Sequence, residues 1–209
     1  MLRHRTTQKK TLNGREADMK HFFAYMARMK YIRRWSLMKN STAENVQEHT
    51  TQTAMIAHCL ALISNRLYNG RLDENKAALL ALYHEAGEVL TGDLPTPVKY
   101  FNPEIKAAYK NIEAIAEQRL LTALPQELRS DYEALVVQRD SSERRIVKYA
   151  DKISAYLKCV EELRCGNNEF SHAAASIKAE IEAYGAPEVD YFMCQFAPSF
   201  ALTLDELEL

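Results

Sequence analysis

The chain has 209 residues, of which 47% are hydrophobic and 26% are charged, and this composition supports one globular domain with a sizeable core. It excludes a disordered chain. The 27 basic and 28 acidic side chains leave a net charge of -1, which excludes a general positive field for nucleic acid or an anionic membrane. Any anionic ligand must therefore be met by a local basic residue.

The sequence contains no segment typical of export or of a membrane anchor. Its longest apolar stretch, residues 54–63, is too short to span a bilayer and is interrupted by His58. The N-terminus is polar and lacks the apolar core of a signal peptide. The four cysteines form no CxxC pair and are expected to be reduced core residues: Cys59, Cys159, Cys165 and Cys194. We therefore expect a cytoplasmic protein with no membrane partner.

Residues 1–18 are basic and polar, without periodicity. We expect a flexible N-terminal extension or a remnant of recombinant expression there, followed by one folded domain over residues 19–209. A basic arm that contacts nucleic acid is the alternative. Because the segment is short and lacks interleaved aromatic residues, we expect no nucleic acid polymer as a partner.

Helical periodicity dominates the rest of the chain, and the six glycines and six prolines fall mostly between periodic stretches. This pattern predicts an all-α fold with no internal repeat. Asp18 is predicted to cap a first helix with four residues on its inner side: Phe22, Phe23, Met26 and Met29. Residues 41–44 fit a capping box and predict a long helix that carries His49 and ends near residues 69–70.

Asp73 is predicted to cap a third helix, which carries the sequence HEAGE at residues 84–88 and stops at the sequence GDLPTP at residues 92–97. The prolines of GDLPTP lack amide donors and restrict the residues before them, so we expect a stiff loop. A helix is then predicted from Asn102 to Pro125. Its apolar stripe consists of Ile105, Tyr109, Ile112, Ala116 and Leu120.

Three more helices are predicted in the C-terminal part of the chain. A short one ends near Val137, and a serine at 141 or 142 caps the next one, which carries Asp151 and ends at Gly166. The apolar stripe of this helix consists of Ile146, Ala150, Ile153, Leu157 and Val160. The last helix is expected from about residue 169 to 185.

The sequence HEAGE places three polar side chains directly after an apolar run. In a helix, residues three and four apart share a face, so Glu88 is expected beside His84 and Glu85. A lone histidine on an apolar helix most often satisfies a core hydrogen bond, which is the ordinary explanation for each residue taken singly. Burying the whole cluster without a partner is costly, and a bound cation compensates for that cost. The clustering therefore indicates a metal-centred hydrolytic site.

His49 and Asp151 lie on two other predicted helices and complete this set of donors. Neutral imidazole and carboxylate oxygen suit one divalent transition-metal ion, namely Co, Mn, Fe or Zn. The order of a histidine, a histidine followed by an acid, and a distant aspartate resembles the HD-domain metal-dependent phosphohydrolases. That resemblance implies a single-domain, all-α helical bundle.

Longer segments extend the resemblance, over residues 19–209, to the bacterial 5'-deoxynucleotidase YfbR subfamily. They are RRWSLM at 33–38, ENVQEH at 44–49, YHEAGEVLTGDLPTPVKYF at 83–101, KYADKISAYLKC at 148–159 and GNNEF at 166–170. The resemblance implies an HD-type phosphohydrolase domain that removes the 5'-phosphate from deoxyribonucleoside monophosphates with a divalent ion. It also implies a homodimer.

The resemblance assigns metal ligation to four residues, His49, His84, Glu85 and Asp151. Glu88 matches the family's catalytic acidic residue, which orients or deprotonates the attacking water. Arg34 and Trp35 match an Arg-Trp pair in which the arginine orients the phosphate and the tryptophan lines the sugar. A planar guanidinium offers two donors to phosphate oxygens, whereas the ordinary alternatives are a solvated charge for Arg34 and packing for Trp35. A rigid indole against C2' is expected to exclude a hydroxyl there and to favour deoxyribose.

The loop that contacts substrate in the family corresponds to Asp93, Leu94, Pro95 and Thr96. Asp93 and Thr96 are free to hydrogen-bond a sugar hydroxyl or a base edge, although a structural turn in which Asp93 caps local amides explains them as well. A catalytic role for Asp93 as proton donor to the leaving 5'-oxygen requires a raised pKa. Lys99 adds charge for the phosphate or lies in solvent.

Glu85 stands where the family's motif has aspartate. Its extra methylene moves the carboxylate outward by a distance comparable to the tolerance of a metal site, and we expect ligation to survive with reduced affinity or a changed preferred metal. Two other functions stay open: a catalytically weakened nucleotide-binding protein with the same fold, and an HD phosphohydrolase that acts on nucleoside di- or triphosphates. An enzyme that acts on di- or triphosphates needs more basic residues near its site than Arg34 and Lys99.

Overall fold

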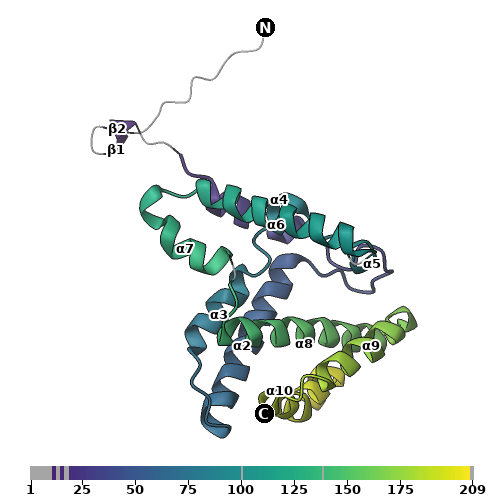
Figure 1. Ribbon diagram of the computed structural model, residues 1–209. Coiled ribbons are helices and arrows are strands. Elements are labelled where there is room, and N and C mark those ends of the chain that lie inside the picture. The colour runs from purple at the N-terminus through teal and green to yellow at the C-terminus, as the bar shows by residue number, and fades with distance from the viewer. Residues whose placement is uncertain (1–10, 13–14, 17–18, 100, 138, 208–209) are drawn as a thin grey trace.

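The computed structural model describes residues 11–12, 15–16, 19–99, 101–137 and 139–207. Helices form the body of the protein, which confirms the all-α prediction (Figure 1). The two strands, β1 (Thr11–Leu12) and β2 (Arg15–Glu16), form a short antiparallel pair. The predicted extension at residues 1–18 falls mostly outside the described residues, so it stays a prediction, as does a single domain over residues 19–209.

The main core forms where three helices pack against one another, α2 (Val46–Leu67), α3 (Glu74–Tyr83) and α8 (Ser142–Arg164). Two further helices, α9 (Ser171–Glu182) and α10 (Pro187–Gln195), pack on α8 and α2 respectively. Small side chains are fully buried on all three central helices: Ala57, Ala61, Ala77, Ala81 and Ala150. Because these residues have no bulk beyond Cβ, the three helices approach closely.

A second apolar cluster forms around the segment that follows α3. It involves α1 (Phe22–Met26), α6 (Pro103–Thr122) and α7 (Arg129–Val136), which lie above the main bundle in Figure 1 together with α4 (Glu88–Thr91) and α5 (Thr96–Lys99). Its buried members are Phe22, Ala86, Leu120, Leu121, Leu124 and Val136. Short 3-10 turns complete the structure: η1 (Met29–Tyr31), η2 (Gln126–Leu128), η3 (Asn168–Phe170), η4 (Ala197–Ala201) and η5 (Leu204–Glu206).

Most predicted helix starts are confirmed at the level of the capping hydrogen bond. The Asp73 side chain accepts from the Lys76 amide, the Asn102 side chain from the Ile105 amide, and the Ser141 side chain from the Arg144 amide. Some predicted core positions are wrong. The inner-face assignment fails for Phe23, Ile105 and Ile112, and the core assignment fails for two cysteines, because all five are exposed: Phe23, Ile105, Ile112, Cys165 and Cys194.

The predicted start of α2 is also wrong. The capping box is built from Asn45 and Glu48, not from residues 41–44: the Glu48 amide donates to Asn45 Oδ1 over 3.0 Å, and the Asn45 amide donates to Glu48 Oε2 over 3.2 Å. Both segments fit the sequence pattern, but the backbone amides of Ser41 and Thr42 bind a distant carboxylate, that of Glu162. Residues 41–44 therefore form a loop, and Glu44 is free for other contacts.

The sequence HEAGE does not continue the helix before it, contrary to the prediction. Helix α3 ends at Tyr83, residues 84–87 form a turn, and α4 begins at Glu88. The hydrogen bonds in the turn span three residues, as from the Glu88 amide to the Glu85 carbonyl over 3.0 Å. Residues before the turn pack in the main core and Ala86 packs in the second cluster, so the chain passes between the two cores here. His84 and Glu85 lie at this junction.

The loop predicted over residues 92–97 is shorter than expected. Gly92 leaves α4 with a φ of 73°, a left-handed conformation that glycine adopts without a side-chain clash. The chain then turns back into the short helix α5 at Thr96, so only residues 92–95 form an irregular loop. Within the described residues, no helix combines the length and apolarity that crossing a bilayer requires.

The capping box at Asn45 gives a first prediction. Asn45→Ala removes the acceptor for the Glu48 amide and should lower the free energy of unfolding by about 1 kcal/mol in urea denaturation. Ser41→Ala is the matched control, since its hydroxyl belongs to the box that the sequence predicted, and it should change stability by less than about 0.5 kcal/mol. A larger loss for Ser41→Ala than for Asn45→Ala contradicts this assignment.

Candidate metal centre

The structure brings together the four side chains that the sequence singled out as metal ligands. They come from three elements: His49 from α2, His84 and Glu85 from the turn after α3, and Asp151 from α8. Each offers one donor atom, and these atoms lie within 4.8 Å of one another. Nε2 of His49 lies 3.0 Å from Asp151 Oδ1, and Nε2 of His84 lies 3.4 Å from Glu85 Oε1.

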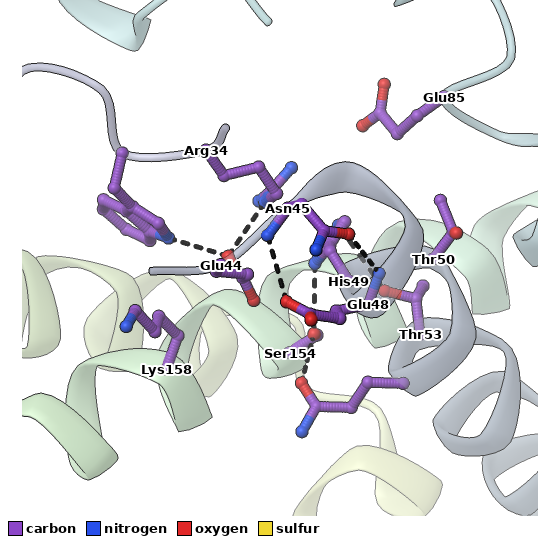
Figure 2. Close-up of polar contacts among 12 residues, drawn as sticks. Arg34, Glu44, Asn45, Glu48, His49, Thr50, Thr53, Glu85, Ser154 and Lys158 are labelled. Carbon is purple, nitrogen blue, oxygen red and sulfur yellow. Dashed lines mark hydrogen bonds and ion pairs between the residues drawn. The ribbon is translucent and has the colours of Figure 1, made fainter. Parts of the chain in front are cut away.

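The ring of His49 is oriented by a hydrogen-bond chain that ends on its own helix (Figure 2). The Ser154 hydroxyl donates its one proton to Gln52 Oε1 over 2.6 Å, in the amide orientation found here. Its oxygen therefore accepts from Nδ1 of His49, which lies 3.1 Å away. The proton of the neutral ring is thus held on Nδ1, and Nε2 faces the cluster with a lone pair.

The ring of His84 is fixed in the same sense by the backbone. Its Nδ1 lies 2.6 Å from the carbonyl oxygen of Ala81, and a carbonyl only accepts hydrogen bonds. Nδ1 therefore carries the proton. Nε2 is buried and has no hydrogen-bond partner among the described residues. Both histidines thus turn Nε2 toward the same small space. Burial works against a charge on His84, but the carboxylates of Glu85 and Asp151 outweigh burial and raise its pKa, and a metal ion would take the place of the proton that they favour.

The donor set fits a divalent transition-metal ion. Burial and the nearby charge of Arg34 lower the pKa of His49, so its ring is neutral and its lone pair faces the Asp151 carboxylate. Such lone pairs and carboxylates repel one another unless a cation lies between them. The four donor atoms lie within 4.8 Å of one another, so these residues would hold one such ion between them.

Glu85 remains within this set despite its extra methylene. The residue lies in the turn between α3 and α4, where the backbone is not held in the regular register of a helix. Its Oε1 atom lies 3.4 Å from Nε2 of His84. The geometry therefore supports the expected survival of ligation at position 85, which stays a prediction.

Glu88 begins α4 and is buried beside the cluster. Burial, together with the charges of Glu85 and Asp93, raises the pKa of Glu88 to about 10. One carboxyl oxygen, Oε2, has no hydrogen-bond partner among the described residues. A cation in the cluster would favour the ionised form and lower this pKa, so Glu88 is suited to take up a proton.

Arg34 lies at the edge of the cluster, in the segment before α2. Burial works against its charge, but the carboxylates of Asp151 and Glu44 outweigh burial and raise its pKa, so the guanidinium stays charged. Its Nε donates to Glu44 Oε2 over 3.1 Å, and Nε1 of Trp35 donates to the same oxygen over 3.1 Å (Figure 2). Both residues of the predicted Arg-Trp pair therefore donate a hydrogen bond to the Glu44 carboxylate.

Of the four described residues in the predicted substrate loop, only Asp93 interacts with the cluster. Asp93 is half-buried, and burial raises its pKa, as does the charge of Glu85. Three other members of the predicted loop make no hydrogen bond to the cluster within the described part of the chain: Leu94, Pro95 and Thr96. Lys99 is half-buried and paired, because its amine lies 2.8 Å from Glu113 Oε1.

Sequence reasoning missed the residues that support the predicted site. Ser154 follows Asp151 by three positions on α8, and this helical spacing was the signal for it. Arg144 precedes Asp151 by two helical turns, and its charge acts on Asp151 and Glu85. Glu44 was hidden because the sequence assigned it to the capping box of α2.

The arrangement of the helices is that of the HD-domain phosphohydrolases. An HD-domain phosphohydrolase from Listeria innocua superposes with a TM-score of 0.76 at 22% identity, over 86% of this chain and 88% of that one. The cyanophage S-2L HD phosphohydrolase, solved with dA and one catalytic Zn2+ ion, gives a TM-score of 0.59 at 21% identity, over 86% of this chain and 96% of that one. This chain therefore has the fold of those HD-domain phosphohydrolases.

Closer similarity identifies the family. The model of the YfbR-like 5'-deoxynucleotidase family matches residues 21–200. The 5'-deoxynucleotidases of Yersinia pestis (strain Pestoides F) and Yersinia pseudotuberculosis (serotype O:3, strain YPIII) are each 51% identical over 193 residues, which cover 91% of this chain and 98% of the relative. The chain belongs to the YfbR-like 5'-deoxynucleotidase family, and the resemblance seen in the sequence is confirmed.

Removing one imidazole gives a second prediction. His84→Gln removes the buried Nε2 donor and should lower the affinity for Zn2+ about 100-fold or more, as measured by competition with a chelator. His58→Gln is the matched control, because His58 is a half-buried histidine on α2 outside the cluster. An unchanged affinity in His84→Gln, or an equal loss in His58→Gln, contradicts the assignment.

Proposed function

We propose that this protein hydrolyses the 5'-phosphate of deoxyribonucleoside monophosphates, giving the deoxynucleoside and phosphate, with one divalent ion held by His49, His84, Glu85 and Asp151. The observation that carries the proposal is the convergence of these four donors beside Arg34 and Glu88. The 51% identity to curated 5'-deoxynucleotidases supports the reaction. The dA and Zn2+ bound in the cyanophage structure support a deoxynucleoside and a metal ion as ligands.

The chain's own residues are suited to hold such an ion. Two imidazole nitrogens and two carboxylates suit Co, Mn, Fe or Zn, and the carboxylate charges offset that of the ion. When bound, the ion supplies Lewis acidity for a phosphoryl oxygen and lowers the pKa of water. Ser154 and the Ala81 carbonyl hold the Nδ1 atoms of His49 and His84, so that both Nε2 atoms point inward.

Arg34 binds the phosphate in this proposal. Its Nε is committed to Glu44, which leaves the two terminal amino groups as a fork for phosphate oxygens. The guanidinium keeps its charge at any working pH, so it offsets the negative charge of the phosphate and of the transition state. Trp35 lines the sugar, and its rigid ring against C2' leaves no room for a ribose hydroxyl.

Two carboxyl groups move protons in opposite directions. Glu88 takes a proton from the attacking water as the water oxygen bonds to phosphorus, and its unpartnered Oε2 is the atom available for it. The bond from phosphorus to the 5'-oxygen breaks, and Asp93 gives a proton to that oxygen. The raised pKa of Asp93 is what this role requires. With Leu94, Pro95 and Thr96, Asp93 also borders the nucleoside.

Lys99 is relevant to the alternative functions. A triphosphate needs several cations along its length, and Lys99 is already paired with Glu113. This pairing disfavours a di- or triphosphatase. We also propose a homodimer in the cytoplasm. The four free cysteines fit a reducing compartment, and exposed apolar residues before and along α6 are suited to a second copy: Phe101, Ile105, Ile112 and Ile115.

Phosphate release from dAMP, AMP and dATP, with Mn2+ or Co2+ added, tests the proposal. We expect dAMP to be hydrolysed at least 10-fold faster than AMP, and dATP not to be hydrolysed. Arg34→Lys keeps the charge but loses the planar fork, so it should lower kcat/KM for dAMP about 10-fold or more. Sedimentation of the same preparation should give twice the 23.9 kDa chain mass.

Three results would contradict the proposal. No release with any metal ion points to the catalytically weakened protein, and faster release from dATP than from dAMP points to the triphosphatase. Equal rates with AMP and dAMP remove the role given to Trp35.

A further inference from the structure

One oxygen atom of Glu44 holds two neighbouring side chains of the site. Oε2 accepts from Nε of Arg34 and from Nε1 of Trp35, each over 3.1 Å (Figure 2). The contact is largely shielded from water, since the Arg34 and Glu44 side chains are only 13% and 11% exposed. A carboxylate only accepts hydrogen bonds, and it is strongest with a charged donor such as Arg34. The two side chains are therefore linked to each other through one oxygen atom.

Trp35 has a backbone conformation that its residue type disfavours. Its φ is 56°, in the left-handed region where Cβ crowds the backbone. The Met38 amide and the Asn40 side chain donate to its carbonyl oxygen, and its ring packs 5.3 Å from the Phe170 ring. Disfavoured conformations persist where the surroundings fix them, and they cluster at functional sites. The Glu44 bond is what sets the direction of the indole nitrogen.

Glu44 is itself anchored from α8. Its carbonyl oxygen accepts from the Arg34 amide over 3.0 Å, and the loop before it is tied down by Glu162, which accepts from the Ser41 and Thr42 amides. Lys158 pairs with Glu162 and donates to the Thr42 carbonyl over 2.5 Å. We therefore expect Glu44 to stay in place when Arg34 and Trp35 bind a ligand.

If Glu44 were absent, Arg34 could form an ion pair with another carboxylate of the site. Asp151 and Glu85 are both close enough for their charges to act on the guanidinium. If the Arg34 guanidinium paired with Asp151 or Glu85, it would occupy the space proposed for the cation and the phosphate. Glu44 prevents this, because it is the carboxylate that binds Nε and leaves the terminal amino groups free.

We propose that Glu44 is a positioning residue that fixes Arg34 and Trp35 as one unit, so that phosphate binding and the choice of deoxyribose are coupled through its Oε2 atom. This inference rests on the proposed function for the roles of the two side chains. The physical link itself does not depend on turnover. It is therefore testable in the ligand-free protein as well as in the assay.

The matched pair Glu44→Gln and Glu48→Gln isolates this link. Each removes one carboxylate near the start of α2, and glutamine at position 48 still serves the capping box. Glutamine at position 44 offers a weaker, neutral acceptor to two donors. Trp35 is the only tryptophan, so the tryptophan fluorescence reports on the surroundings of this one indole ring.

For Glu44→Gln we expect at least a twofold rise in acrylamide quenching of Trp35, at least a tenfold rise in KM for dAMP, and at least a fivefold fall in the dAMP to AMP ratio of kcat/KM. Zn2+ affinity should change less than threefold, which separates positioning from loss of the metal site. Glu48→Gln should match the wild type throughout. Should Glu44→Gln fail to fold, Glu44→Asp, which keeps the charge but shortens the reach, should show the same changes at smaller size.

Unchanged quenching in the Glu44 variant, or a sugar preference equal to that of the wild type, overturns the proposal. If the wild-type protein releases no phosphate from dAMP, that result contradicts the proposed function and not the role of Glu44. In that case the quenching comparison and the binding of dAMP by titration still decide whether Glu44 holds the pair. A rise in quenching with weaker dAMP binding would support the link, and no change would refute it.

Discussion

The close packing of α2, α3 and α8 is the constraint on which the site depends. Fully buried alanines on all three helices let the backbones approach, and His49, the turn at His84 and Asp151 lie where they meet. The four donor atoms then need no long side chains to reach one another. A bulkier core would move the helices apart and open the cluster, because a metal site tolerates only a few tenths of an ångström.

Helix α8 joins the two halves of the site. Near its middle it carries Asp151 and Ser154, which serve the metal cluster, and toward its end it carries Lys158 and Glu162, which hold the loop that leads to Glu44. One rigid helix, α8, therefore holds both the phosphate-binding groups and the metal-binding groups in place. Catalysis by positioned groups gains from such rigidity, since small displacements of a ligand or donor are costly in rate.

Sequence reasoning succeeded where the cause is local. The caps at Asp73, Asn102 and Ser141 follow from hydrogen bonds that span three residues. The His and Asp side chains chosen for their chemistry do converge in space, and their binding of a metal ion stays a prediction. Sequence reasoning failed where distant contacts decide. Two segments fitted a capping box before α2, and the distant Glu162 settled which one became a loop. The break at HEAGE follows from the junction of two cores, which no local pattern encodes.

The central claim is that His49 and His84 both turn Nε2 toward one shared ion beside Glu85 and Asp151. Crystals grown with Co2+, with data collected on both sides of the cobalt absorption edge, test it directly. The account predicts one strong anomalous peak per chain, about 2.0 to 2.2 Å from both Nε2 atoms and from one oxygen of each carboxylate. No peak at this position, or ligation through Nδ1 of either ring, would contradict it.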